Sequence, residues 1–378
     1  MNSGKTRKPK IAILGSRGIP ATYGGYESIA QELGSGLAKK GFEVYVSCES
    51  KGFKIKPYGT YQGVRLVYFP VVAAFRSISE AFVYDFLSVL WAMQRADIIY
   101  MLGYSSAPTL IFPKLLGKKV LVNSDGLEAA RRKFNPLLRF FYRSFEKLSV
   151  KICDYIVVDS LTIGHYYSQN YSISPIYIPN GGGSVKEVAP LNPIALNRFG
   201  IEKGDYYLVL ARLIPDNNID LIIEGFKKAN TRKKLVIVGP LNRNSYVRRL
   251  LREKTDRILF IGGIYQPNLQ RTLRCNCFAY IHGHEMGGTN PSLVEALSCR
   301  NTILSLDVPF TREVAEDSAI YFKKDADDLK NRIEALENKT DRGPNEEAYE
   351  IYQKKYSAEK TINAFIEFVN CIAKQEVK

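Results

Sequence analysis

The 378-residue sequence has few of the residues that metal centres and disulfide frameworks need. It contains only three histidines and six cysteines, and the cysteines are scattered through runs typical of strands and helices. Cys275 and Cys277 form a C-x-C pair, but no second pair accompanies them to complete a zinc site. We therefore expect free thiols and no metal site.

Long apolar runs and low-complexity tracts are also missing. The most apolar stretch, residues 81–93, is interrupted by Asp85 and is too short to span a bilayer. The basic first ten residues are followed by the strand-like segment IAIL rather than by the long apolar region of a signal peptide. These features lead us to expect a cytoplasmic protein.

Acidic residues are outnumbered, with 38 Asp and Glu against 53 Lys and Arg and a net charge of +15. Such an excess suits nucleic acid, an anionic membrane surface or phosphorylated small molecules. The sequence has no helix-turn-helix, RNP or zinc-finger pattern, which disfavours nucleic acid as the partner. Segment 131–151 has seven basic residues and one acid, with apolar residues at roughly helical spacing. It predicts a basic amphipathic helix that either covers the core or attaches the protein peripherally to an anionic membrane.

Short runs rich in Val, Ile and Tyr alternate with longer helical stretches along the whole chain. Apolar strands separated by helices are typical of βαβ units and buried parallel sheets. Two such series predict an α/β protein with two doubly wound domains. We place the boundary in the Gly- and Pro-rich segment 178–190, giving domains 1–185 and 186–356, and expect a final helix near 357–378 to pack back on the first. The expected strands are 10–14, 43–48, 64–69, 98–102, 119–123, 154–159, 205–211, 234–238, 257–261, 277–282, 302–306 and 319–322.

A glycine-containing loop follows the first strand. The segment GSRGIPATYGGYE, residues 15–27, leads from that strand into a helix, and such a unit offers backbone N–H groups and a helix dipole to an anion. It lacks the dinucleotide G-x-G-x-x-G spacing and a Walker lysine. The loop is either a tight structural turn or a binding loop, and its length and polar content favour binding. The candidate binding residues are Arg17, Gly24 and Gly25 for a phosphate-bearing donor substrate and Tyr23 and Glu27 for an acceptor substrate.

Polar residues follow two strands of the second series. Arg212 comes just after the strand at 205–211, where a guanidinium can grip a diphosphate through paired N–H donors. After the strand at 277–282, the loop HGHEMGGTNP places glycine N–H groups and short polar side chains at a helix entrance. Glu295 lies among apolar residues of that helix and needs a partner, either a ribose or an internal arginine. The loop candidates for donor binding are His284, Gly287, Gly288, Thr289 and Asn290.

Together these segments resemble the retaining nucleotide-sugar glycosyltransferases of the large family 4 class, which have the GT-B fold. The likeness covers nearly the whole chain, and GSRGIPATYGGYE resembles a subgroup of bacterial rhamnosyltransferases. It implies two Rossmann-like domains facing a central cleft. It also implies that Arg212 binds the donor diphosphate, with Asn217 where the class has a lysine, and that Glu295 binds the ribose. Gly287 stands where the class has its first glutamate.

The resemblance implies transfer of a sugar from a dTDP, UDP or GDP donor to a glycan hydroxyl, with no cofactor required. Loss of the first glutamate is consistent with dTDP-rhamnose as the donor, and the basic segment 131–151 suggests a lipid-linked glycan acceptor. Asp125 and Glu128, just after the strand at 119–123, are candidates for the acceptor side, and Asp125 is either a sugar-positioning residue or a helix cap. Arg212 and Asp125 are the catalytic candidates. A nucleotide-sugar epimerase on the same fold is the alternative.

Overall fold

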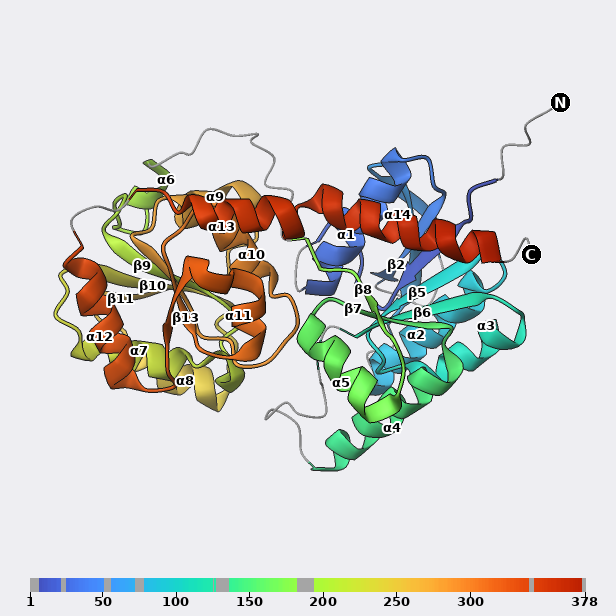
Figure 1. The fold of residues 1–378 in the computed structure, drawn as a ribbon, viewed down its shortest axis with the longest axis horizontal. Coiled ribbons are helices and arrows are strands. Elements are labelled where there is room, and N and C mark those ends of the chain that lie inside the picture. The colour runs from blue at the N-terminus through green and yellow to red at the C-terminus, as the bar shows by residue number, and fades with distance from the viewer. Residues whose placement is uncertain are drawn as a thin grey trace. The chain divides into compact units, whose positions relative to one another are not determined.

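The computed structural model describes residues 7–21, 25–50, 56–71, 78–124, 126, 136–181, 194–339 and 343–375. The chain forms two compact units. Unit 1 takes the described residues up to Gly181 and returns to use those from Ala358 onward, whereas unit 2 takes the residues between them. Each unit is a mostly or fully parallel sheet with helices on both faces (Figure 1).

Unit 1 has an eight-stranded sheet in the order β3-β4-β2-β1-β5-β6-β7-β8. All neighbouring strands are parallel except β3, which runs antiparallel to β4 at one edge. Its strands are β1 Ile11–Leu14, β2 Val44–Ser50, β3 Lys56–Tyr61, β4 Val64–Pro70, β5 Ile98–Leu102, β6 Lys119–Ser124, β7 Tyr155–Val158 and β8 Ile176–Tyr177. Its helices are α1 Gly25–Lys39, α2 Ile78–Ala92, the 3₁₀ helix η1 Ala107–Leu110, α3 Ile111–Leu115, α4 Pro136–Ile152, α5 Leu161–Tyr171 and α14 Ala358–Gln375.

Unit 2 has a six-stranded, fully parallel sheet in the order β11-β10-β9-β12-β13-β14. Its strands are β9 Tyr206–Leu210, β10 Lys234–Val238, β11 Ile258–Gly262, β12 Ala279–His282, β13 Ile303–Leu306 and β14 Ala319–Phe322. Its main helices are α6 Ile194–Asn197, α7 Ile219–Lys228, α8 Ser245–Leu251, α9 Pro267–Cys275, α10 Pro291–Ser298, α11 Pro309–Ala315, α12 Ala326–Glu337 and α13 Glu346–Ile351. Short elements complete it: η3 Pro215–Asn217, η4 Glu316–Ser318 and the π-helix η5 Tyr352–Tyr356.

The strand alternation explains why unit 2 has a core on each face of its sheet. Tyr207 and Val209 of β9 pack in one buried cluster, while Tyr206 and Leu208 pack in the other. Successive side chains of a strand point to opposite faces, so a strand that is apolar throughout is buried on both sides. The predicted α/β class with two Rossmann-like domains is therefore confirmed.

Every strand expected from the sequence is present, but β3 and β8 were not anticipated. β3 contains Pro57 and Gly59, which indicate a turn rather than a strand, and its ladder with β4 is irregular between these two residues. Proline lacks an N–H donor and is tolerated in edge strands, where β3 lies. β8 has only two residues, which is too short for a periodic pattern.

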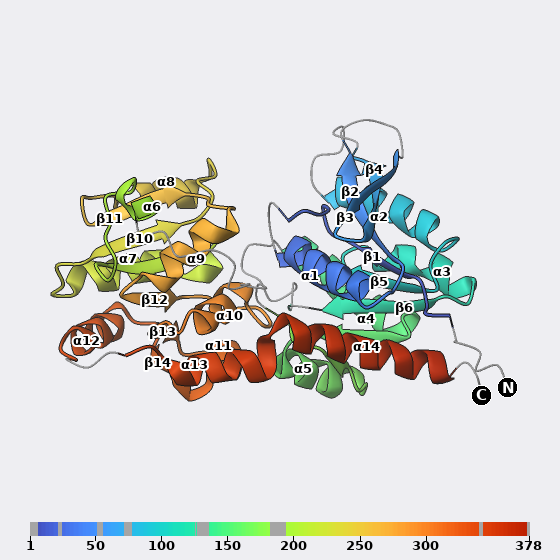
Figure 2. The ribbon, with the colours of Figure 1, turned by 90° about the horizontal axis from the view of Figure 1, so that it is seen from above.

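The last helix, α14, belongs to unit 1 and packs against α1 (Figure 2). Phe365 is fully buried, and its ring centroid lies 5.1 Å from that of Tyr100 on β5. The Thr361 hydroxyl donates to the Pro179 carbonyl at 2.8 Å. A Cβ at Gly36 of α1 would clash with Ile362, so the small residue at this position lets the two helices approach closely.

Candidate active site

In unit 2, the chain order of the strands reverses beside β9. From β9 the chain passes to β10 on one side, and it later reaches β12 on the other side. In open α/β sheets, ligands bind beyond the carboxyl ends of the strands at such a switch point. The loops that follow β9 and β12 carry the predicted donor-binding residues of this domain, so the fold brings them to one edge.

These two loops are fastened to each other. The Asn218 amide nitrogen donates to the Gly283 carbonyl at 2.9 Å, and the Glu285 N–H donates to the Asp216 carbonyl at 3.0 Å. A Cβ at Gly283 would stand 2.6 Å from the Asn217 carbonyl oxygen, so glycine is needed for this approach. The loop after β9 and the loop after β12 therefore form one hydrogen-bonded surface.

Arg212 and Asn217 have different places in the loop after β9. Arg212 is exposed and forms no ion pair within the part of the chain that the structure describes. Asn217 is buried, and its side-chain nitrogen donates to the Arg212 carbonyl at 2.7 Å. The guanidinium is thus available to a ligand, while the amide holds the backbone from which it projects.

Glu295 has an internal arginine as its partner. It forms an ion pair with Arg274, whose side chain is only 4% exposed, whereas the Glu295 side chain is 22% exposed. A buried charge is tolerated when an opposite charge neutralises it. Of the two partners expected for this carboxylate, the structure therefore shows the arginine, which lies on α9 and has no sequence signal that links it to Glu295.

Gly287 and Gly288 form the turn before α10. Gly287 has a φ of +148°, a conformation that side-chain-bearing residues rarely adopt, and no atom lies within 4 Å of where its Cβ would be. The backbone N–H groups of both glycines have no partner within the described residues. Asn290 caps α10, its side-chain oxygen accepting from the Ser292 N–H at 3.0 Å. Thr289 is buried behind this turn.

A small pocket opens beside this turn. It has room for about one water molecule, and its lining includes His282, His284, Gly287, Gly288, Asn290 and Thr311. The rings of His282 and His284 stack with centroids 4.3 Å apart. Burial lowers the pKa of His282 to about 3, so this imidazole is neutral at physiological pH.

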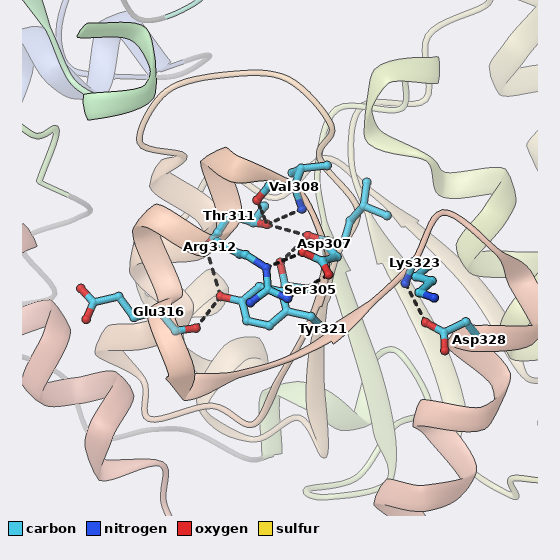
Figure 3. A network of polar contacts seen from close by, with 10 residues as sticks. Ser305, Asp307, Val308, Thr311, Arg312, Glu316, Tyr321, Lys323 and Asp328 are labelled. Carbon is cyan, nitrogen blue, oxygen red and sulfur yellow. Dashed lines mark hydrogen bonds and ion pairs between the residues drawn. The ribbon is translucent and has the colours of Figure 1, made fainter. Parts of the chain in front are cut away.

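Thr311, which lines the pocket, belongs to a polar network at the start of α11 (Figure 3). The Thr311 hydroxyl donates to the Leu306 carbonyl at 2.5 Å, which occupies its proton. Asp307 and Arg312 form two parallel hydrogen bonds of 2.5 and 2.8 Å, and this contact lowers the pKa of the Asp307 carboxyl. These contacts hold the start of α11, which contributes Thr311 to the pocket.

In unit 1 the corresponding switch point lies between β1 and β5. A Cβ at Gly15, just after β1, would stand 2.5 Å from the Leu102 carbonyl oxygen of β5. Glu27 is buried and accepts from the Arg17 N–H at 2.9 Å, so it holds the first glycine loop. The Arg17 side chain is 67% exposed, with Glu49 3.8 Å away. Gly25 begins α1.

Four candidates lie outside the described residues: Tyr23, Gly24, Asp125 and Glu128. The same holds for residues 131–135 of the basic segment, whereas the rest of that segment forms most of α4. Among the residues that the structure describes, no cluster of three or more His, Cys, Asp or Glu side chains is arranged to hold a metal ion. All six cysteines are free. None of the described helices is long and apolar enough to cross a membrane.

Two family matches divide the chain at nearly the same place as the two units. Residues 8–182 match the family described as Domain of unknown function (DUF1972). Residues 195–356 match the family described as Glycosyl transferases group 1. The second match contains Arg212, Glu295 and the pocket, whereas the first contains the glycine loop of unit 1.

Proteins similar to this chain include one relative by sequence and two by structure. The O-antigen chain mannosyltransferase RfbU of Salmonella typhimurium is 23% identical over 207 residues, which is 53% of this chain and about half, 55%, of that protein. Sucrose-phosphate synthase (tll1590) from Thermosynechococcus elongatus superposes with a TM-score of 0.81 at 16% identity, covering 98% of this chain and 100% of that one. Anabaena Alr3699/HepE, solved in complex with UDP, superposes with a TM-score of 0.72 at 13% identity, covering 96% and 100%.

The two parallel sheets, the switch-point loops and the family match lead to one identification. The chain as a whole has the GT-B fold, and its residues 195–356 match the family described as Glycosyl transferases group 1.

Proposed function

We propose that this enzyme transfers a sugar, with retention of configuration, from a nucleoside diphosphate donor to a hydroxyl group of a glycan. The observation that carries the proposal is that the loops after β9 and β12 are hydrogen-bonded to each other. They present the Arg212 guanidinium and the N–H groups of Gly287 and Gly288, none of which has a partner among the described residues, at the switch point of the unit 2 sheet. Cations and N–H donors together suit a diphosphate.

In the proposed reaction, negative charge grows on the leaving phosphate as the glycosidic bond breaks. Arg212 and the N–H groups of 287–290 stabilise that charge more in the transition state than in the ground state. The acceptor hydroxyl attacks from the face that the phosphate leaves, and its proton passes to the departing phosphate. No protein nucleophile is needed. Glu295, held by Arg274, binds the ribose, and Asp125 positions the acceptor or the sugar.

For the donor we propose dTDP-rhamnose. The support is the rhamnosyltransferase-like segment at residues 15–27 and the glycine at 287, where the resembling class has a glutamate. GDP-mannose is the second candidate, because the related Salmonella protein is named an O-antigen chain mannosyltransferase. The same name supports cell-surface polysaccharide assembly as the process that this enzyme serves.

For the acceptor we propose a lipid-linked glycan, reached from the surface of an anionic membrane. On α4, Leu137 and Phe140 are 64% and 65% exposed, and Arg143, Lys147 and Lys151 are exposed beside them. α4 packs against η1, which leads directly into α3, and there Leu115 is 77% exposed. Exposed apolar side chains with basic ones on the same helix suit a layer of acyl chains beneath anionic headgroups.

Arg212→Ala tests the donor site. We expect transfer to fall on the order of a hundredfold, because the charge on the leaving phosphate loses its cation. The assay follows glycosyl transfer from dTDP-rhamnose, GDP-mannose and UDP-glucose to a lipid-linked glycan. Arg252→Ala is the matched control, since this exposed arginine ends α8 at the opposite edge of the sheet. Unchanged transfer by Arg212→Ala, or a product that is an epimerised free donor, would refute the proposal.

A further inference from the structure

A chain of hydrogen bonds runs from the β9 backbone to His282. The Ser292 hydroxyl donates to the Leu210 carbonyl at 2.8 Å. The Tyr280 hydroxyl lies 2.7 Å from the Ser292 oxygen and 3.3 Å from Nδ1 of His282. Its distance to the Leu210 carbonyl is longer, 3.4 Å. The chain therefore links a carbonyl, two hydroxyl groups and an imidazole nitrogen in sequence.

The hydrogen-bond distances along this chain favour one tautomer of His282. Each hydroxyl group has one proton, and that of Ser292 is directed at the Leu210 carbonyl, 2.8 Å away, which can only accept. The Tyr280 proton then goes to the Ser292 oxygen, the closer of its acceptors. With this assignment the Tyr280 oxygen is left to accept from His282, and Nδ1 carries the imidazole proton. A neutral imidazole has one proton, which makes Nε2 an acceptor.

Burial keeps His282 in this neutral state and leaves Nε2 in need of a partner. The residue is 1% exposed, and Nε2 has no hydrogen-bond partner among the described residues. A buried acceptor without a partner is destabilising, because it has lost its hydrogen bonds to water and gained none in the protein. His282 lines the small pocket at the turn formed by Gly287 and Gly288, so a group that enters the pocket can supply the missing hydrogen bond.

The group that enters must be a hydrogen-bond donor. Phosphate and carboxylate oxygens at neutral pH only accept, so they do not satisfy Nε2, whereas a sugar hydroxyl can donate. The pocket has room for about one water-sized group, which fits a single hydroxyl. The Thr311 hydroxyl, which also lines the pocket, already donates to a carbonyl and leaves Nε2 to the ligand.

We propose that His282 is a specificity residue of the donor site, whose Nε2 accepts a hydrogen bond from one hydroxyl of the transferred sugar. Ser292 and Tyr280 are positioning residues that hold the acceptor tautomer. In this arrangement the N–H groups of Gly287 and Gly288 bind the phosphate, and Nε2 of His282 binds the sugar. The hydrogen-bond donors and the hydrogen-bond acceptor at this turn therefore contact different parts of the ligand. This inference rests on the proposed nucleotide-sugar donor.

The tautomer is tested without any ligand. Selective ¹⁵N labelling of histidine gives three side chains to assign, and His165→Gln and His284→Gln identify the signals of the other two. Nitrogen shifts of His282 are expected to show a protonated Nδ1 and an unprotonated Nε2 in the wild type. In Tyr280→Phe, which removes the Nδ1 partner, the Nε2-protonated form should appear. A protonated Nε2 in the wild type would overturn the proposal.

The sugar contact is tested by calorimetry with dTDP-rhamnose, GDP-mannose and UDP-glucose, each paired with its free diphosphate dTDP, GDP or UDP. In His282→Leu we expect the sugar nucleotide to bind about tenfold more weakly, the equivalent of one lost hydrogen bond. The free diphosphate should bind as it does to wild type. His282→Gln, which returns an acceptor oxygen at similar reach, should recover part of the loss, and exposed His165→Gln should lose nothing.

The outcomes separate this inference from the function on which it rests. Wild type that binds neither a sugar nucleotide nor a diphosphate would overturn both. Wild type that binds both ligands, with His282→Leu weakening them equally or not at all, would overturn the sugar contact alone. Melting temperatures show whether each variant folds, and Tyr280→Phe, which leaves the imidazole in place, should lose affinity for the sugar nucleotide but not for the diphosphate.

Discussion

At the candidate site, a polar side chain that is buried needs a partner for its charge or its hydrogen bonds. Glu295 and Arg274 come from two different helices, and their charges compensate each other where neither could remain alone. His282 is buried too, but it is neutral and keeps one nitrogen without a partner in the described part of the chain. The Glu295–Arg274 pair is satisfied within the protein, whereas His282 needs a ligand to complete its hydrogen bonds.

The ion pair makes a stability prediction at the residue scale. Glu295→Leu leaves the Arg274 charge buried without a partner, and we expect unfolding free energy to fall by about 3–5 kcal/mol. The double variant Arg274→Leu, Glu295→Leu should recover most of that loss, because no charge is then stranded. Urea unfolding followed by far-UV circular dichroism measures the unfolding free energy of the single and the double variant. Equal destabilisation by the single and double variants would show that packing, not charge, sets the cost.

At the scale of elements, α3 and α4 expose several large apolar side chains. Ile111, Phe112, Leu115 and Leu116 belong to α3 and its end, and Leu137, Phe140 and Phe141 belong to α4; each is at least 41% exposed. The sequence pointed to α4 alone, since α3 is too short to show an amphipathic period. Only the packing of α4 on η1 joins the two sets.

Flotation with vesicles tests this surface. The protein should be retained by vesicles of phosphatidylcholine with phosphatidylglycerol at low salt, and less at high salt, because salt screens surface charges. Arg143→Glu with Lys147→Glu should weaken retention at least about tenfold, since each basic residue near such a surface contributes about 1 kcal/mol. Arg252→Glu with Lys254→Glu, exposed on unit 2, is the matched control. Equal retention of all three proteins would exclude the attachment.

At the scale of the whole molecule, the chain builds unit 1, then unit 2, and then returns to unit 1 with α14. Phe365 and Val369 of this helix are fully buried among residues of α1 and the unit 1 sheet. The fold of unit 1 therefore depends on residues that follow unit 2 in the sequence. The two units share a chain, but each has buried clusters of its own.

Phe365→Ala separates the stabilities of the two units. Deleting this buried ring should destabilise unit 1 by about 3–5 kcal/mol through lost burial and a cavity. Hydrogen exchange followed by mass spectrometry should show faster exchange in α1 and β5 and unchanged exchange in β9 and β12. Leu115→Ala, an exposed position in unit 1, serves as the control. Faster exchange in unit 2 to the same extent would contradict this assignment of α14.

Much of this protein is determined by the sequence alone. Continuous apolar strands such as 98–102 and 234–238 predict buried parallel strands, because a segment apolar on both faces must be covered on both. Arg212 and the Gly287–Gly288 turn follow strand ends, so their placement at the carboxyl edge also follows from the strand pattern. Local periodicity and chain order are sufficient for these features.

The tertiary structure decided what depends on partners distant in sequence. β3 forms only because β4 offers it an edge, against the turn-like signals of Pro57 and Gly59. Arg274 rather than a ligand neutralises Glu295 in the protein itself. The assignment of Nε2 of His282 as a hydrogen-bond acceptor depends on two hydroxyl groups, a carbonyl and the imidazole, which come from three different elements. Ion pairs and hydrogen bonds require groups to meet within a few ångströms, and only the folded chain brings such groups together.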